Sequence, residues 1–177
     1  MSRDGGQLTV FAYGSLLFRP GFEYAERRPA VATGYARRFR QASPDHRGTP
    51  ERPGRVVTLV PAEGVSCAGA LYVVRGPSEQ LLVELDYRER AGYERVRIDV
   101  LADGVRMSAV TWIAPPGNPY DAGELELAEL AALVRAATGP SGHNAEYVFL
   151  LEHALAELGI VDPAVSELAA LLRAVNG

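Results

Sequence analysis

One carboxylate stands out in the segment Pro77–Arg90, which the sequence predicts to be a helix beginning at a Ser78 cap. Leu82, Leu85 and Glu89 recur at helical spacing, so Glu89 falls on the apolar face of this helix. A carboxylate buried without a counter-charge has a raised pKa and is more basic, as a general base requires. The alternative is a side chain at the helix end that turns into solvent or pairs with a distant arginine.

Four other charged residues of this predicted helix have partners of opposite charge four positions away. Glu84 is spaced to pair with Arg88, and Asp86 with Arg90. This pairing leaves Glu89 without a helical counter-charge.

A second candidate site follows the first predicted strand, Gln7–Tyr13, where the chain reads Tyr13-Gly14-Ser15-Leu16. A glycine at this point lets the backbone approach a ligand closely. Consecutive amide N–H groups of such a turn can bind a carboxylate or stabilise a developing oxyanion. Gly-Ser turns are also common after strands. The chain has neither G-x-S-x-G nor G-x-G-x-x-G, which argues against a serine hydrolase at Ser15 and gives nucleotide binding no support.

The histidines and the cysteine predict neither a metal site nor a covalent mechanism. His46, His143 and His153 do not stand at the spacing of metal ligands, and there is no H-E-x-x-H motif. We expect His46 to shape its polar loop, with ligand contact as the alternative, and His153 to lie on the surface. The single cysteine, Cys67, excludes an internal disulfide and opens an apolar strand, where we expect it to pack rather than react.

Composition excludes several further classes of protein. The chain has 177 residues, 47% of them hydrophobic, which is enough to bury a core in one domain. All 18 basic residues are arginine, which excludes a Schiff-base lysine and the lysine of a P-loop. A net charge of −4 argues against nucleic-acid binding, and no apolar run approaches the ~20 residues of a membrane span. Met1–Gly6 does not form a signal peptide, so with a lone cysteine we expect a cytoplasmic protein.

Arginine is concentrated in the first third of the chain. Residues 1–60 carry ten arginines against five acidic residues, whereas residues 61–177 carry eight against 17. A basic region attracts small anionic substrates, so an arginine such as Arg47 or Arg88 is a candidate for holding a substrate carboxylate. The alternative is that the arginines line exposed strands and loops.

The segment Gly139-Pro140-Ser141-Gly142 is dense in residues that interrupt regular structure. It can be explained fully as punctuation before a helix, with Ser141 as the cap. The alternative is that it brings Asn144, Glu146 or Tyr147 to a pocket.

Strands in the first part of the chain and helices in the rest must position these residues. Further strands are expected over Arg28–Arg40, Arg55–Pro61, Cys67–Val74, Tyr93–Leu101 and Val105–Ile113, with a polar loop over Gln41–Gly54 and a tight turn at Asp103-Gly104. Further helices are expected over Glu124–Thr138, Asn144–Leu158 and Pro163–Val175. Consecutive strands joined by hairpins favour an antiparallel or mixed sheet and an α+β fold rather than a doubly wound one.

Four stretches, in this order, resemble the ChaC-type γ-glutamylcyclotransferases, the glutathione-specific branch of that family. They are VFAYGSL (Val10–Leu16), RRF-x-Q-x-S-x-DHRGTP-x-x-PGRVVTLV (Arg37–Val60), LDYRE-x-x-GY (Leu85–Tyr93) and GPSG-x-N-x-EY (Gly139–Tyr147). The resemblance implies a mixed β-barrel with flanking helices, one domain over residues 1–177 in which helices of about 124–176 pack on the barrel.

The resemblance also implies a reaction without metal or cofactor, in which glutathione is cleaved to 5-oxoproline and cysteinylglycine. Its general base maps onto Glu89. The backbone that cradles the γ-glutamyl group maps onto six consecutive residues: Ala12, Tyr13, Gly14, Ser15, Leu16 and Leu17. Arg47, Arg88 and Tyr147 complete the set of pocket candidates.

Three positions depart from the family pattern and bear on specificity. Ala12 stands where the family usually has glycine, and Phe18 and Arg40 stand where it favours tryptophan. The alternatives are a cyclotransferase acting on other γ-glutamyl amines or amino acids, and a non-catalytic γ-glutamyl-binding module. A hydrolase using Ser15 or Cys67 is a third. The expected partner is a small molecule, with no nucleic acid and no membrane, and the sequence makes no prediction of oligomeric state.

Overall fold

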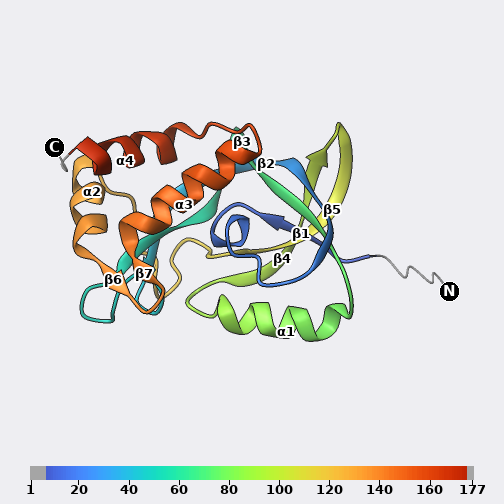
Figure 1. The fold of residues 1–177 in the computed structure, drawn as a ribbon, viewed down its shortest axis with the longest axis horizontal. Helices are drawn as coiled ribbons and strands as arrows, with labels where there is room; N and C mark the ends of the chain where they lie inside the picture. Colours follow the sequence, from blue (N-terminus) through green and yellow to red (C-terminus); the bar gives the residue numbers. More distant parts are fainter. Residues whose placement is uncertain (1–6, 175–177) are drawn as a thin grey trace.

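Five strands close into a barrel in the order β1-β3-β2-β4-β5 (Figure 1). The computed structural model describes residues 7–174. Strand bounds are β1 Thr9–Ala12, β2 Tyr24–Ser43, β3 Gly54–Val74, β4 Glu94–Ala102 and β5 Val105–Ile113. All neighbouring pairs are antiparallel except β1 with β5, which is parallel. The mixed barrel expected from the resemblance is therefore confirmed.

The short strand β1 closes the barrel between β3 and β5. Val10 and Phe11 are fully buried, and Val10 pairs with Val110 of β5. The Thr111 hydroxyl donates a hydrogen bond to the Phe11 carbonyl at 2.9 Å. Closure thus fixes the end of β1 and the Gly14–Leu16 turn that follows it.

Strands β2 and β3 form a longer hairpin than the sequence predicts. The two predicted strands over Arg55–Pro61 and Cys67–Val74 belong to one strand, β3. Its pairing with β2 jumps at Gly34, so the mostly exposed residues 62–65 form an irregular section. Exposure removes the apolar pattern there, which is why the sequence predicts a break.

The helices lie in two groups around the strands (Figure 1). Their bounds are α1 Ser78–Arg88, α2 Leu127–Ala136, α3 Asn144–Glu157 and α4 Pro163–Ala174. In Figure 1, α1 lies apart from the other three, which pack against one another through buried residues such as Leu151 of α3 and Leu168 of α4. No helix within residues 7–174 has the length and apolar character needed to cross a membrane.

Both predicted helix caps are wrong. Ser78 is the first residue of α1, and the residue before it forms no side-chain cap bond. Helix α3 begins at Asn144 as predicted, but a small hairpin of β6 (Thr138–Gly139) and β7 (Gly142–His143) precedes it, so His143 rather than Ser141 is its cap. The Ser141 hydroxyl instead lies 3.1 Å from Nδ1 of His46.

The sole cysteine packs as expected. Cys67 is 3% exposed in the barrel core, and burial raises the pKa of its thiol to about 11. A thiol with so little thiolate at neutral pH is a poor nucleophile. The structure thus argues against a cysteine hydrolase.

Candidate active site

A cavity of about 290 Å³ brings the predicted site residues together. It lies between the end of β1, the end of α1 and the first turns of α3. Nine of the ten predicted site residues line it: Ala12, Tyr13, Gly14, Ser15, Leu16, Arg47, Arg88, Glu89 and Tyr147. The tenth, Leu17, is buried next to the lining residues and is not part of the wall.

The turn after β1 is a short 3-10 helix, η1 (Ser15–Leu17). The Leu17 N–H donates to the Gly14 carbonyl at 3.0 Å, so the N–H groups of Ser15 and Leu16 have no acceptor within the turn. A Cβ atom at Gly14 would lie 3.1 Å from a methyl group of Val57, closer than most side chains tolerate. Glycine therefore allows the turn to lie against the cavity wall.

Glu89 ends helix α1 rather than continuing it. The helix stops at Arg88, and Glu89 is its C-cap residue, whose N–H still donates to the Leu85 carbonyl at 2.9 Å. Its side chain is 16% exposed and lines the cavity. Burial raises the pKa of the Glu89 carboxyl above its ordinary value, although the nearby Arg88 and His46 act in the opposite direction. A raised pKa makes this carboxylate a stronger base than an exposed glutamate.

The predicted helical ion pairs are wrong. Glu84 accepts a hydrogen bond from Gln80 at 3.0 Å instead of pairing with Arg88. Asp86 lies 3.4 Å from Arg95 of β4, and it accepts from the indole N–H of Trp112 at 2.8 Å. Side chains at the end of α1 turn toward the barrel, where tertiary partners replace those one helical turn away.

Arg88 connects the end of α1 to the turn after β1. Its Nη2 donates to the Ser15 hydroxyl at 3.2 Å and its Nη1 to the Arg19 carbonyl at 2.7 Å. Its Nε lies 3.5 Å from Oε1 of Glu89, so Glu89 does have a counter-charge, contrary to the prediction. Because each nitrogen of the guanidinium has a protein partner, Arg88 fixes Glu89 relative to the turn and has few donors left for a substrate.

Arg47 is the better placed arginine for binding a substrate. Its side chain is 3% exposed, and its Nη1 donates to the His143 carbonyl at 3.1 Å and to Glu146 at 3.3 Å. Its guanidinium also lies 5.9 Å from the ring centre of Tyr147. Within the described part of the chain, its Nε and Nη2 form no hydrogen bond. These donors are free to bind a carboxylate in the cavity.

Two tyrosines contribute differently to the cavity wall. The Tyr13 hydroxyl donates to the Trp112 carbonyl at 2.6 Å, which uses its proton. The Tyr147 hydroxyl accepts from the Val57 N–H at 3.2 Å, and burial raises the pKa of this phenol. Tyr147 therefore keeps a proton that it can donate to a bound ligand.

His46, which was expected to shape its loop with ligand contact as the alternative, lines the cavity. Its Nδ1 lies 3.1 Å from the Ser141 hydroxyl and its Nε2 lies 3.3 Å from the Arg88 carbonyl. The loop thus joins the end of α1 to the β6–β7 hairpin, so the expected loop-shaping role and a position at the cavity coincide. The one signal in the sequence was the resemblance of the DHRGTP stretch.

Of the three positions that depart from the family pattern, two line the cavity and one does not. Ala12 and Phe18 line the cavity, and the Phe18 ring packs edge-on against Tyr147 with centroids 5.7 Å apart. Arg40 does not line it and pairs with Asp121. A change of specificity would therefore arise at Ala12 or Phe18.

Both the sequence and the fold of this chain are similar to those of known proteins. A family model described as "ChaC-like protein" matches residues 8–176. Gamma-glutamylcyclotransferase 2-3 of Arabidopsis thaliana is 37% identical over 174 residues, covering 93% of this chain and 87% of the relative. Glutathione-specific gamma-glutamylcyclotransferase 1 of Homo sapiens is 36% identical over an alignment of 154 residues, which covers 84% of this chain and 69% of the human protein. A crystal structure of the yeast cyclotransferase specific to glutathione superimposes with a TM-score of 0.87 at 27% identity, covering 97% of this chain and 100% of that one.

Proposed function

Since this chain belongs to the ChaC-like family, we propose that it is a glutathione-specific γ-glutamylcyclotransferase. It cleaves glutathione to 5-oxoproline and cysteinylglycine by an intramolecular reaction. The observation that carries the proposal is the buried carboxylate of Glu89, which lines the same cavity as the Gly14–Leu16 turn. We also propose a cytoplasmic location, where a lone cysteine remains a thiol.

The first step is attack of the glutamyl α-amine on the γ-carbonyl of the same residue. An α-amine with a pKa of about 8 is mostly protonated at neutral pH and cannot attack until it loses a proton. Glu89 accepts that proton. The cavity holds the amine near the carbonyl, which removes much of the entropic cost of bringing the two groups together.

The second step is collapse of the tetrahedral intermediate. The N–H groups of Ser15 and Leu16 stabilise the oxyanion, which formed together with the new C–N bond in the first step, until the intermediate collapses. The bond from the γ-carbon to the cysteinyl nitrogen then breaks, and Glu89 gives its proton to that leaving nitrogen. The ring nitrogen still carries two hydrogens after the attack, and Glu89 transfers one of them to the same leaving amine. The ring therefore leaves as 5-oxoproline with one amide hydrogen and the dipeptide leaves as an ammonium ion, so no water is consumed.

Arg47 and Tyr147 recognise the substrate in this proposal. The free donors of Arg47 bind a carboxylate of glutathione, since guanidinium and carboxylate geometries match. The Tyr147 hydroxyl proton provides a further donor in the same wall.

Product analysis tests the proposal directly. Purified protein is incubated with glutathione, and 5-oxoproline and cysteinylglycine are quantified by mass spectrometry. The expected result is equal molar amounts of the two. The same assay with γ-glutamylcysteine and γ-glutamyl amines distinguishes the alternative substrates. Tight glutathione binding without either product would instead indicate a non-catalytic module.

The pH dependence of kcat/KM should reveal the ionisation of Glu89. The carboxylate must be deprotonated to accept the amine proton, and burial raises its pKa above the ordinary value of 4.5. We therefore expect the acid limb of kcat/KM for glutathione to fall at a pH above 4.5. An acid limb at or below that pH contradicts the assignment, since the carboxyl groups of the substrate titrate lower, at about 3.3–3.7.

Replacing Ser15 with alanine should slow the reaction only modestly. The substitution removes the hydrogen bond from Arg88 but leaves the N–H groups of the turn in place. Losing one hydrogen bond to a charged group costs about 1.5–3 kcal/mol, so a loss of about 10- to 100-fold in kcat/KM is the upper range. Steady-state kinetics check it. A loss as large as that of a Glu89 variant would mean that the hydroxyl itself takes part in the chemistry.

A further inference from the structure

Two amide side chains from outside the cavity hold the turn that follows Glu89. Gln41 of β2 donates through Nε2 to the Ala91 carbonyl and to Oδ1 of Asn118, both at 2.9 Å. Asn118 donates through Nδ2 to Oε1 of Gln41 at 3.0 Å. Both hydrogens of the Gln41 amide are used, and its side chain is only 1% exposed. Only one orientation of this amide satisfies all three bonds.

The turn itself leaves no space between its backbone and this amide pair. A Cβ atom at Gly92 would lie 2.3 Å from Oδ1 of Asn118 and 2.5 Å from Nε2 of Gln41. Gly92 also has a φ of +87°, which other residues rarely adopt. The two amides therefore define the path of the chain just after Glu89.

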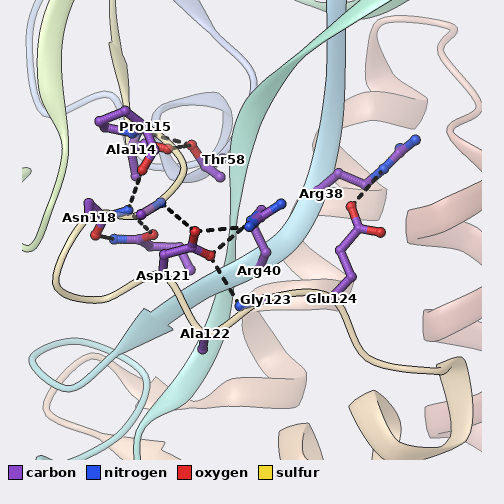
Figure 2. A network of polar contacts seen from close by, with 12 residues as sticks. Arg38, Arg40, Thr58, Ala114, Pro115, Asn118, Asp121, Ala122, Gly123 and Glu124 are labelled. Atoms are coloured by element: carbon purple, nitrogen blue, oxygen red, sulfur yellow. Dashed lines mark hydrogen bonds and ion pairs between the residues drawn. The ribbon is translucent and has the colours of Figure 1, made fainter.

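Asn118 is itself held rigidly by the loop that carries it, residues 115–123 (Figure 2). Asp121 accepts two hydrogen bonds from the Arg40 guanidinium, each at 2.9 Å, and a third from the Gly123 N–H at 3.1 Å. The hydrogen bonds from Arg40 hold the pKa of the Asp121 carboxyl well below its usual range. Asn118 also donates to the Pro115 carbonyl at 2.8 Å. The loop is thus a fixed support rather than a flexible connection.

Neither amide lines the cavity, so neither touches the substrate. Ala91 does line it, and Ala91 is two residues from Glu89. On the basis of the proposed function, we propose that Gln41 and Asn118 are positioning residues that set the direction of the Glu89 carboxylate through the Ala91–Gly92 backbone. Arg88 contacts the same carboxylate directly, with its Nε 3.5 Å from Oε1 of Glu89.

Replacing Asn118 with alanine tests this inference. The change leaves the Gln41–Ala91 hydrogen bond without its support, so Glu89 loses alignment while Arg47 and the Gly14–Leu16 turn remain. We expect kcat for glutathione to fall roughly 10- to 100-fold with little change in KM, as for a small misplacement of a catalytic group. Glu124→Gln is the matched control on the adjoining segment. Glu124 forms an exposed ion pair with Arg38 at 3.4 Å, and its variant should keep the wild-type kcat.

Two further measurements separate positioning from a general loss of folded protein. In Asn118→Ala the acid limb of kcat/KM should move to lower pH, because a less confined Glu89 is better solvated. In a Glu89→Gln background the same substitution should cause no further loss of residual activity, because its effect passes through the carboxylate. Gly92→Ala should reproduce the kinetic signature of Asn118→Ala by displacing the same contact.

Failure of the positioning role can be distinguished from failure of the proposed function. If the wild-type protein releases no cysteinylglycine, the proposed function fails before any variant is compared. If the wild-type protein is active and Asn118→Ala matches Glu124→Gln in kcat, the positioning role is wrong. A loss of equal size in the Glu89→Gln background also overturns it, since Asn118 would then act independently of Glu89.

Discussion

Replacing Glu89 with glutamine is expected to lower kcat for 5-oxoproline formation by roughly 10²- to 10⁴-fold while the protein still folds. Glutamine keeps the size of the side chain but cannot accept a proton from the substrate amine. Product release is measured with glutathione at neutral pH. Glu84→Gln is the control on the same helix, because Glu84 is exposed, accepts a hydrogen bond from Gln80 and does not line the cavity. Substantial 5-oxoproline release by the Glu89 variant would exclude it as the base.

The same substitution should raise the free energy of unfolding at neutral pH. Burial raises the pKa of Glu89 in the folded protein, so between its ordinary and its raised pKa the folded state binds more protons than the unfolded state. Stability contributed by the protonated form is complete below the ordinary pKa and is lost as pH rises through the raised pKa. Urea unfolding should therefore show a stabilisation by Glu89→Gln at pH 7 that disappears below about pH 4. An active site that costs stability is consistent with a functional carboxylate.

The second large effect is expected when Asp162 is replaced with alanine. Asp162 precedes α4 and pairs with Arg37, whose side chain is 1% exposed. Arg37 also donates to the Tyr13 carbonyl at 2.8 Å and to the Ala68 carbonyl at 2.6 Å. Removing the carboxylate leaves a buried guanidinium without a counter-charge, which destabilises a protein by about 3–5 kcal/mol. Chemical unfolding of the variant measures this loss.

A more exposed ion pair in the same helical group provides the control. Glu152 of α3 pairs with Arg173 of α4, and the Arg173 side chain is 56% exposed. Replacing Glu152 with alanine should change the free energy of unfolding by less than about 1 kcal/mol. Equal losses in the two variants would mean that the burial of Arg37 does not determine the effect.

The sequence predicts those elements well whose local signals agree with their surroundings. Strand β5 has the predicted bounds because Asp103 and Gly104, both with positive φ, form the predicted two-residue turn. Helix α4 begins at Pro163 as predicted. Glu89 also lies on the face of α1 that the apolar spacing predicts. Although Glu89 is the C-cap residue, its N–H still donates to the Leu85 carbonyl, so its backbone follows the path of the helix.

Long-range polar contacts leave no such local signal. Gln41 and Asn118 are 77 residues apart, and although Gln41 is the glutamine of the RRF-x-Q stretch that resembles the family, nothing in the local pattern predicts that the two amides pair. The counter-charge of Glu89 is missed for a related reason, since Arg88 is adjacent in sequence and helical spacing places it on another face. Only the end of the helix brings the two side chains together.

Closure of the barrel by β1 has a consequence for the order in which the protein acquires activity. Val10 pairs with Val110, and the Tyr13 hydroxyl reaches the Trp112 carbonyl, so both contacts join segments about 100 residues apart. Such contacts require the whole intervening chain to be in place, and they form slowly because a long loop must be closed first. A nascent chain therefore cannot assemble the substrate cradle until its fifth strand has emerged from the ribosome and met the first.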